Sequence, residues 1–205
     1  MAEKKKPEER KNEILDISEK LFKENGYERT SIEQILKELK LSKGGFYHHF
    51  KSKEEVLDGI IKRFTDLAAT SAQEVVENPD WDARQKMIHL LAAIRIDSQD
   101  ELLTEIHRPE NNVMHLKSLL ESTKVLVPYF GQVARQGIEE GHFKMEYPDE
   151  VMEGLFLIAS IWFDEGFFDL SDDQKFQRAA AFMEMAEKCT GDHSGMFQLH
   201  NIIQK

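Results

Sequence analysis

The sequence predicts an all-α protein, in which a small N-terminal bundle of three helices precedes a larger helical domain, with about nine helices in total. Apolar residues recur every three to four positions along almost the whole chain, as they do on one face of an amphipathic helix. No sustained alternation of apolar and polar residues indicates a strand, and β-branched residues are scattered rather than clustered. Residues that cap helices stand where the periodic segments begin and end.

Three helices are expected in the N-terminal bundle. The first covers Pro7–Asn25, because proline suits an early helical position and the following glycine is a typical stop. Thr30 is expected to cap the second helix, since Glu33 follows three residues later as in a capping box. The third helix is expected over Ser42–Phe50 after the short Lys40-Leu41 connection, as a helix-turn-helix requires. Helices this short need tertiary packing, which predicts a compact bundle.

A long fourth helix is expected to begin at the capping box Ser52–Glu55 and to stop near Asn78-Pro79. Pro128 lies within a later periodic segment, and we expect that helix to be bent or broken there. Residues 190–205 are expected to form a short helix or a loose tail. We place the domain boundary after residue 54, which gives domains 1–54 and 55–205. The helices expected in the second domain cover residues 83–96, 100–107, 112–140, 149–168 and 172–189.

The net charge of −11 is unevenly distributed along the chain. Residues 1–54 carry 13 Lys+Arg and 11 Asp+Glu, whereas residues 55–205 carry 14 and 27. A polyanion can therefore bind the N-terminal domain, while the acidic remainder is repelled from it.

The composition favours a cytoplasmic protein. No run of 18 or more apolar residues exists, so a membrane span is not expected. Met1–Arg10 is charged and lacks the apolar core of a signal peptide. Cys189 is the single cysteine and cannot form an internal disulfide, which fits a reducing compartment.

Enzyme activity, a cofactor and a bound metal are not expected. The sequence contains no nucleophile elbow, phosphate-binding loop, zinc-protease motif or dinucleotide fingerprint. His89, His107 and His115 could in principle converge on a ligand or metal, but no two of them have short ligand spacing. His48 and His49 are adjacent, so on a helix they point about 100° apart and are poorly placed to share a metal.

The segment from Ile14 to Val56 resembles the DNA-binding domain of the TetR family of repressors. The residues that carry the resemblance are Ile14–Phe22, Asn25-Gly26-Tyr27, Thr30-Ser31-Ile32 with Ile35, and the run from Leu41 to Glu54, LSKGGFYHHFKSKE. The rest of the chain is similar to the family only in layout. The resemblance implies a homodimer that binds a near-palindromic, double-stranded DNA operator and responds to a small-molecule effector whose identity the sequence does not show.

The chemistry of the third helix agrees with DNA binding. The second helix of a helix-turn-helix enters the major groove, and residues near its start meet base edges. Phe46 and Phe50 are four residues apart and are expected to anchor this helix to the core. Where many relatives carry a small hydroxyl residue, this chain has Gly45, so one direct contact is expected to be missing. The predicted contacts are Thr30, Ser31, Ser42, Lys43, Gly44, Gly45, Tyr47, His48, His49, Lys51 and Lys53.

Family likeness also implies where effector and partner subunit bind. The fourth helix would act as a lever, with the segment 100–109 as the moving contact. Pocket walls are expected from Phe64, Leu91, Ile94, Leu103, Met114, Leu119 and Tyr129. Large side chains in the penultimate helix and an alanine-rich last helix suit a four-helix interface between subunits. Its expected residues are Leu155, Ile158, Ala159, Trp162, Phe163, Phe176, Ala179, Phe182, Met183 and Ala186.

Two alternatives remain open at this point. The chain could be a helical ligand-binding or protein-interaction module whose N-terminal domain docks protein rather than DNA. Within the regulator class, the sequence does not distinguish a ligand-responsive repressor from an activator or from a ligand-independent repressor.

Overall fold

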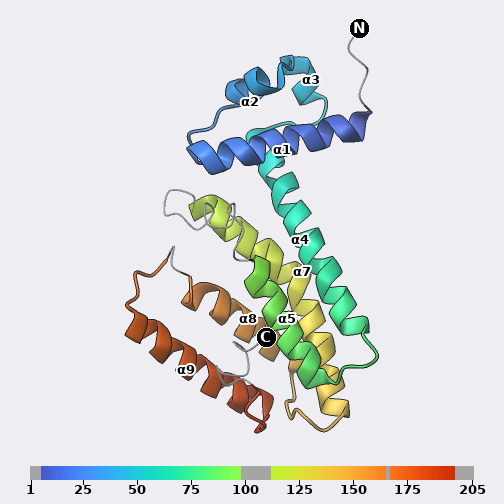
Figure 1. Ribbon diagram of the computed structural model, residues 1–205, viewed down its shortest axis with the longest axis vertical. Helices are drawn as coiled ribbons and strands as arrows, with labels where there is room; N and C mark the ends of the chain where they lie inside the picture. Colours follow the sequence, from blue (N-terminus) through green and yellow to red (C-terminus); the bar gives the residue numbers. More distant parts are fainter. Residues whose placement is uncertain (1–5, 98–111, 165–166, 197–205) are drawn as a thin grey trace. The chain divides into compact units, whose positions relative to one another are not determined.

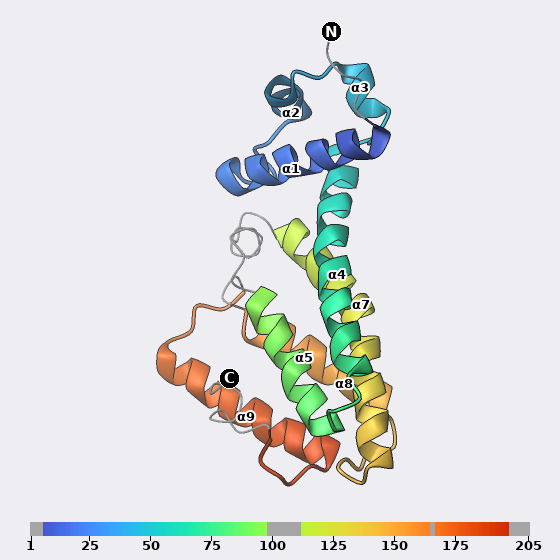
Figure 2. The same cartoon turned by 45° about the vertical axis from the view of Figure 1, so that its right-hand side comes forward.

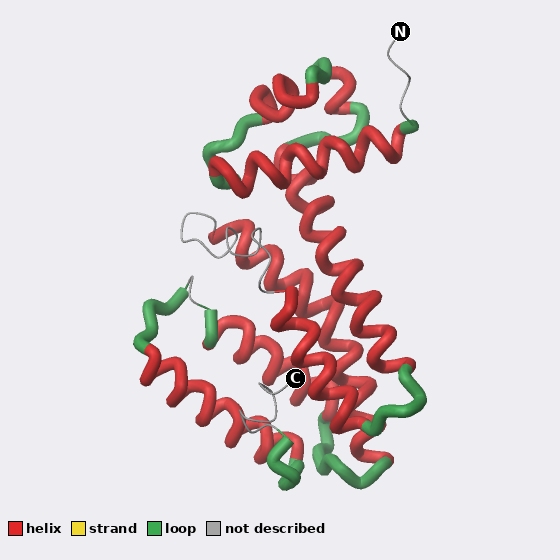
Figure 3. Tube along the Cα trace, in the orientation of Figure 1, coloured by secondary structure: helices red, strands yellow, loops and turns green. Residues whose placement is uncertain are grey.

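The computed structural model describes residues 6–97, 112–164 and 167–196, and in these ranges it contains eight α-helices and no strand. Figures 1 and 3 show this all-helical architecture, which confirms the predicted fold class. The chain divides into two compact units, Met1–Phe64 with Asp100–Ser118, and Thr65–Gln99 with Leu119–Lys205. Two long helices, α4 (Lys53–Glu77) and α7 (Asn112–Glu139), contribute residues to both units.

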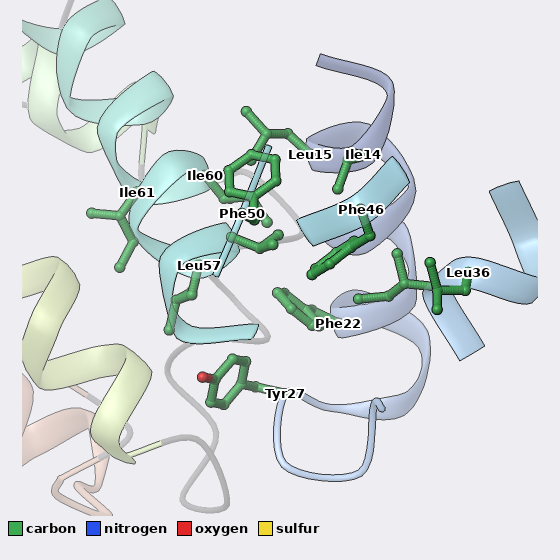
Figure 4. Close-up of a cluster of buried hydrophobic side chains, with 12 residues drawn as sticks. Ile14, Leu15, Phe22, Tyr27, Leu36, Phe46, Phe50, Leu57, Ile60 and Ile61 are labelled. Carbon is green, nitrogen blue, oxygen red and sulfur yellow. The ribbon is translucent and has the colours of Figure 1, made fainter. Parts of the chain in front are cut away.

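In the first unit, α1 (Pro7–Asn25), α2 (Ile32–Leu39) and α3 (Lys43–Tyr47) pack with the beginning of α4. Both ends of α1 are as predicted, and Gly26 closes it with a positive φ of 84°. Figure 2 shows α2 and α3 on the same side of α1. The buried side chains between them form one cluster, drawn in Figure 4: Ile14, Leu15, Phe22, Tyr27, Ile35, Leu36, Phe46, Phe50, Val56, Leu57, Ile60 and Ile61.

The cap of α2 is one residue later than predicted. Ser31 accepts a hydrogen bond from the backbone N–H of Gln34, and the Gln34 side chain accepts one from the Ser31 N–H. Thr30 is only 1% exposed, and its hydroxyl donates to the carbonyl oxygens of Gly26, at 2.8 Å, and of Leu21. The expectation that Thr30 caps α2 with Glu33 was wrong, because this hydroxyl satisfies buried carbonyl groups at the end of α1.

Helix α3 is shorter than predicted and ends at Tyr47 instead of Phe50. Ser42 caps it as expected, accepting a hydrogen bond from the Gly45 N–H at 3.1 Å. Lys40, which closes α2, adopts the left-handed conformation with φ 49°. The turn between α2 and α3 is therefore tight, as a helix-turn-helix requires.

The second unit contains the rest of α4 and α7, together with α5 (Ala83–Asp97), α8 (Pro148–Trp162) and α9 (Asp172–Thr190). The predicted helix over 100–107 lies outside the described residues. Helix α7 continues through Pro128, so it is not broken there. The buried cluster of this unit is Ala72, Ala83, Met87, Leu90, Leu126, Phe130, Val133, Ala134, Phe143, Met152, Ala186 and Met196.

Helix α8 ends at Trp162, six residues before the predicted end at Phe168. An arginine from α9 explains the stop, because the Arg178 guanidinium donates to the Trp162 carbonyl oxygen at 2.6 Å and lies over the Phe168 ring. The carbonyl group at the end of α8 is thereby satisfied without a further helical turn.

After α9, Gly191 adopts a left-handed conformation with φ 68°, and residues 191–196 form turns instead of a helix. The thiol of Cys189, near the end of α9, is exposed. None of the helices that the structure describes has the length and apolar character to cross a membrane.

Candidate nucleic-acid interface

Helix α3 has one buried and one exposed face. Phe46 and Phe50 are buried with ring centroids 6.2 Å apart, and Phe46 lies beside Phe22 of α1 in Figure 4. Their predicted role as anchors is confirmed. The side chain of Tyr47 is 51% exposed. With α3 anchored in this way, most of its other residues and the residue on either side of it are exposed. We call these exposed residues the polar row: Ser42, Lys43, Gly44, Tyr47 and His48.

The two glycines of α3 differ in their surroundings. A Cβ atom added at Gly44 would have no neighbouring atom within 4 Å. A Cβ atom at Gly45 would lie 2.7 Å from Cδ1 of Leu41, so that side chain would have to move. Packing therefore gives a reason for Gly45, whereas the space beside Gly44 is open among the described residues. In a helix, alanine is more stable than glycine by about 0.5–1 kcal/mol.

The lysines around α3 are held in different ways. The Lys43 ammonium lies 3.4 Å from the Glu33 carboxylate, and both side chains are well exposed. Exposed pairs of this kind add little stability, so Lys43 can readily exchange its partner. The Lys51 side chain is exposed.

Lys53, at the first position of α4, lies partly inside the first unit. Its ammonium donates to the carbonyl oxygen of Tyr27 at 2.7 Å and lies 4.2 Å from the centre of the Tyr27 ring. Burial lowers the pKa of Lys53, and Glu28 opposes that shift. Lys53 therefore joins α4 to the turn between α1 and α2, a role that the sequence did not indicate.

The two histidines after Tyr47 lie in a basic environment. Their ring centroids are 5.0 Å apart, and His49 is less exposed than His48. The pKa of His49 is lowered by burial and then by the positive charges of His48, Arg10 and Lys11, while the carboxylate of Glu8 opposes that shift. The beginning of α1 therefore adds two cations near the end of α3. Sequence reasoning missed both of them, because only the fold brings α1 near residue 49.

Ser31 and Thr30 are placed differently from the α3 residues. Ser31 is partly exposed at the start of α2, whereas the Thr30 side chain is buried. Burial gives Thr30 a structural role and removes its side chain from the surface. Across the described ranges, no group of three or more His, Cys, Asp or Glu side chains is arranged to hold a metal ion.

The pocket candidates whose side chains are described lie in both compact units. Phe64 packs against the cluster of the first unit, whereas Leu91 and Tyr129 pack against that of the second. Leu119 is buried. Ile94 and Met114 lie in α5 and α7, but their side chains are not described, and Leu103 lies outside the described residues, as does the predicted moving contact at 100–109.

The predicted interface residues lie on α8, on α9 and just after α8. Helices α8 and α9 contact each other. Phe176 is 66% exposed, and Ile158 is exposed as well. Ala186 is fully buried in the core of its own unit, so its side chain is not available to a partner. Ile161 and Phe167 are also exposed, although neither is in the predicted interface set. The remaining candidates are partly exposed: Leu155, Ala159, Trp162, Phe163, Ala179, Phe182 and Met183.

Two family models match the chain. The model of the tetR family of bacterial regulatory proteins matches residues 14–60, and that of the tetracyclin repressor-like C-terminal domain matches residues 95–185. Together they match more than half of the chain. The first model covers α2, α3 and the polar row described above.

Similar proteins and solved structures agree with these models. The transcriptional regulator YfiR of Bacillus subtilis is 25% identical over 183 residues, covering 82% of this chain and 88% of its own. The transcriptional repressor KstR2 of Mycobacterium tuberculosis is 24% identical over 139 residues, 66% of this chain and 70% of its own.

Among solved structures, a TetR-family regulator from Syntrophomonas wolfei has a TM-score of 0.67 at 22% identity, covering 89% of this chain and 95% of its own. A TetR/AcrR-family regulator from Thermobifida fusca has a TM-score of 0.58 at 22% identity, covering 94% and 98%. The sequence resemblance was therefore correct, and the chain belongs to the TetR family of transcriptional regulators.

Proposed function

We propose that this regulator is a ligand-responsive repressor that binds a near-palindromic operator as a homodimer. Each subunit would place α3 in the major groove of one half-site, because two-fold protein symmetry requires two equivalent DNA contacts. The observation that carries the proposal is the exposed polar row of α3, fixed from behind by Phe46 and Phe50.

Base readout is assigned to the side chains that project from α3. The hydroxyl group of Tyr47 and the imidazole of His48 can donate or accept hydrogen bonds at base edges. The absence of a side chain at Gly44 lets the DNA approach the helix backbone closely, which gives a reason for a glycine beside which no described atom lies within 4 Å of a Cβ position.

Phosphate contacts are assigned to side chains around α3. Lys43 and Lys51 are exposed cations, and Ser31, Ser42, Gly45, His49 and Lys53 complete the proposed set. The buried side chain of Thr30 is left out. Arg10 and Lys11 are added, since their charges act on His49. Cations at this surface also make binding strongly dependent on salt.

The homodimer is assigned to the exposed apolar side chains of α8 and α9. Ile158, Ile161 and Phe176 are large, apolar and exposed in the isolated chain, so their burial against a second copy is favourable. Helical interfaces of this kind form between two copies by two-fold symmetry. The effector is assigned to the second unit, and it must bind one DNA-binding state better than the other to act at all.

A selection experiment followed by titration tests the proposal. The full chain should enrich a two-fold symmetric site from a pool of randomised duplexes, and its affinity for that site should fall steeply as salt is raised. No enrichment would contradict the proposal. Tyr47→Ala should weaken binding by about tenfold or more, as expected for loss of a base contact. Tyr147→Ala is the matched control, because Tyr147 is similarly exposed, at 59%, but lies before α8.

Gly44→Ala separates DNA contact from folding. The added methyl group meets no atom of the described residues within 4 Å, so thermal unfolding should occur at the same temperature or higher. Binding to the selected duplex should nevertheless weaken, because the methyl group occupies space assigned to DNA. Unchanged affinity would show that DNA does not approach the helix at this position.

A further inference from the structure

Lys117, near the beginning of α7, contacts the first turns of α4. Its ammonium lies 3.0 Å from Oε1 of Glu54 and 2.5 Å from Oδ1 of Asp58. All three residues belong to the first unit. The Lys117 side chain is less exposed than either carboxylate. One cation thus lies between two acidic groups of another helix.

A cation shared by these two carboxylates reduces the repulsion between them, which a cation paired with one surface carboxylate does not do. Glu54 and Asp58 are four residues apart on α4, so their charges lie on the same face and repel each other. Lys117 is hydrogen-bonded to Asp58, which raises the pKa of its ammonium; burial lowers that pKa, and Glu54 raises it again. The interaction is thus a small network, and networks contribute more than isolated exposed pairs.

The first turn of α4 is held from another direction as well. Lys53, next to Glu54, donates to the Tyr27 carbonyl oxygen in the turn between α1 and α2. Lys53 therefore ties this turn to the helix-turn-helix, and Lys117 ties it to α7. Through these ion pairs, the beginning of α7 contacts the first turns of α4, the helix that follows α3 in the chain.

We propose that Lys117 is a positioning residue that sets DNA affinity by fixing the first turn of α4 and by offsetting the charges of Glu54 and Asp58. This inference rests on the proposed DNA-binding function. Without Lys117, the turn that carries Lys53 keeps its contact with Tyr27 and the buried side chains of Val56 and Leu57, but it loses its ion pairs with α7. Two uncompensated carboxylates then lie near the proposed phosphate contacts Lys51 and Lys53 and repel the DNA backbone. Both effects weaken binding.

The first part of the test follows amide hydrogen exchange in the full chain without DNA. Lys117→Met removes the charge but keeps an unbranched side chain. Exchange should become at least several-fold faster at the beginning of α4 and in the turn at Tyr27, and stay unchanged in α9. The matched control is Lys124→Met on the same helix, because the ion-pair partner of Lys124 among the described residues is Glu121 of α7, at 2.7 Å. Unchanged exchange at the beginning of α4 in Lys117→Met would overturn the positioning role.

The second part measures affinity for the selected duplex at fixed salt. Lys117→Met should weaken binding about three- to tenfold, whereas Lys124→Met should change it by less than twofold. Lys117→Glu should weaken binding further, and adding Asp58→Lys to Lys117→Glu should restore much of the loss by reversing the pair. Altered exchange with unaltered affinity would overturn the role in DNA binding. Failure of the unmodified chain to bind any duplex would instead contradict the proposed function, while the exchange result would still decide the positioning role.

Discussion

Asp192 is a buried carboxylate whose negative charge is stabilised by hydrogen bonds. Its side chain is fully buried after α9, where one carboxylate oxygen accepts hydrogen bonds from Arg84 of α5 and the other from the Ser194 hydroxyl and N–H. Burial by itself raises the pKa of the Asp192 carboxyl, but the hydrogen bonds from Ser194 and Arg84 outweigh it and the pKa is lowered. The carboxylate therefore joins the end of the described chain to α5.

Arg84→Met should destabilise the protein by about 2 kcal/mol at neutral pH, because it leaves a buried carboxylate with fewer donors. Since the folded pKa of Asp192 lies below its ordinary value of 3.8, the stabilisation is present above that value and is lost as the pH falls through the folded pKa. The difference in the free energy of unfolding between wild type and Arg84→Met, measured by urea unfolding, should therefore become smaller as the pH is lowered. Arg135→Met removes an exposed ion pair with Asp149 and is the control, with an expected loss below about 1 kcal/mol.

At the scale of elements, a prediction about the cap of α2 tests whether Ser31, and not its neighbour Thr30, caps the helix. Ser31→Ala removes the capping box with Gln34 and should destabilise the chain by about 1 kcal/mol, whereas Ser31→Asp should retain most of that stability. Thermal unfolding measures both changes. Equal stability of Ser31→Ala and wild type would contradict the assigned cap.

Helix positions were largely predictable from the sequence, and the exceptions have specific causes. Pro7, Gly26 and Ser171 end or begin their helices through the conformations and capping bonds of neighbouring residues, and these can be predicted from the local sequence. The cap of α2 is also local, but two possible capping boxes overlap there, Thr30 with Glu33 and Ser31 with Gln34, and burial of the Thr30 hydroxyl leaves the second. The end of α8 depends instead on a distant partner, the Arg178 guanidinium that donates to the Trp162 carbonyl oxygen. No local pattern contains such a partner.

Some residues of the candidate site could likewise be predicted from the sequence, whereas others depend on how the helices pack. The anchors Phe46 and Phe50 follow from helical spacing and the family motif. By contrast, the structural roles of Thr30 and Lys53, and the presence of Arg10 and Lys11 near His49, arise only when α1, α3 and α4 pack together.

At the scale of the whole molecule, the apolar surface of α8 and α9 determines the proposed assembly. Phe176→Glu places a charge in the proposed interface and should convert the dimer to a monomer, as measured by sedimentation velocity, and should weaken operator binding. Leu67→Glu is the matched control, because Leu67 is equally exposed, at 67%, but lies on α4. A monomeric wild-type chain, or a dimeric Phe176→Glu variant, would contradict the assignment.

The exposed thiol of Cys189 has a practical consequence for such measurements. Because it is the only cysteine of the chain, a nitroxide spin label reacts at one known position without any engineered substitution. In a symmetric pair of subunits, the two labels report a single distance by pulsed electron resonance. Following that distance as duplex or candidate metabolites are added would record the rearrangement of the assembly from the natural sequence itself.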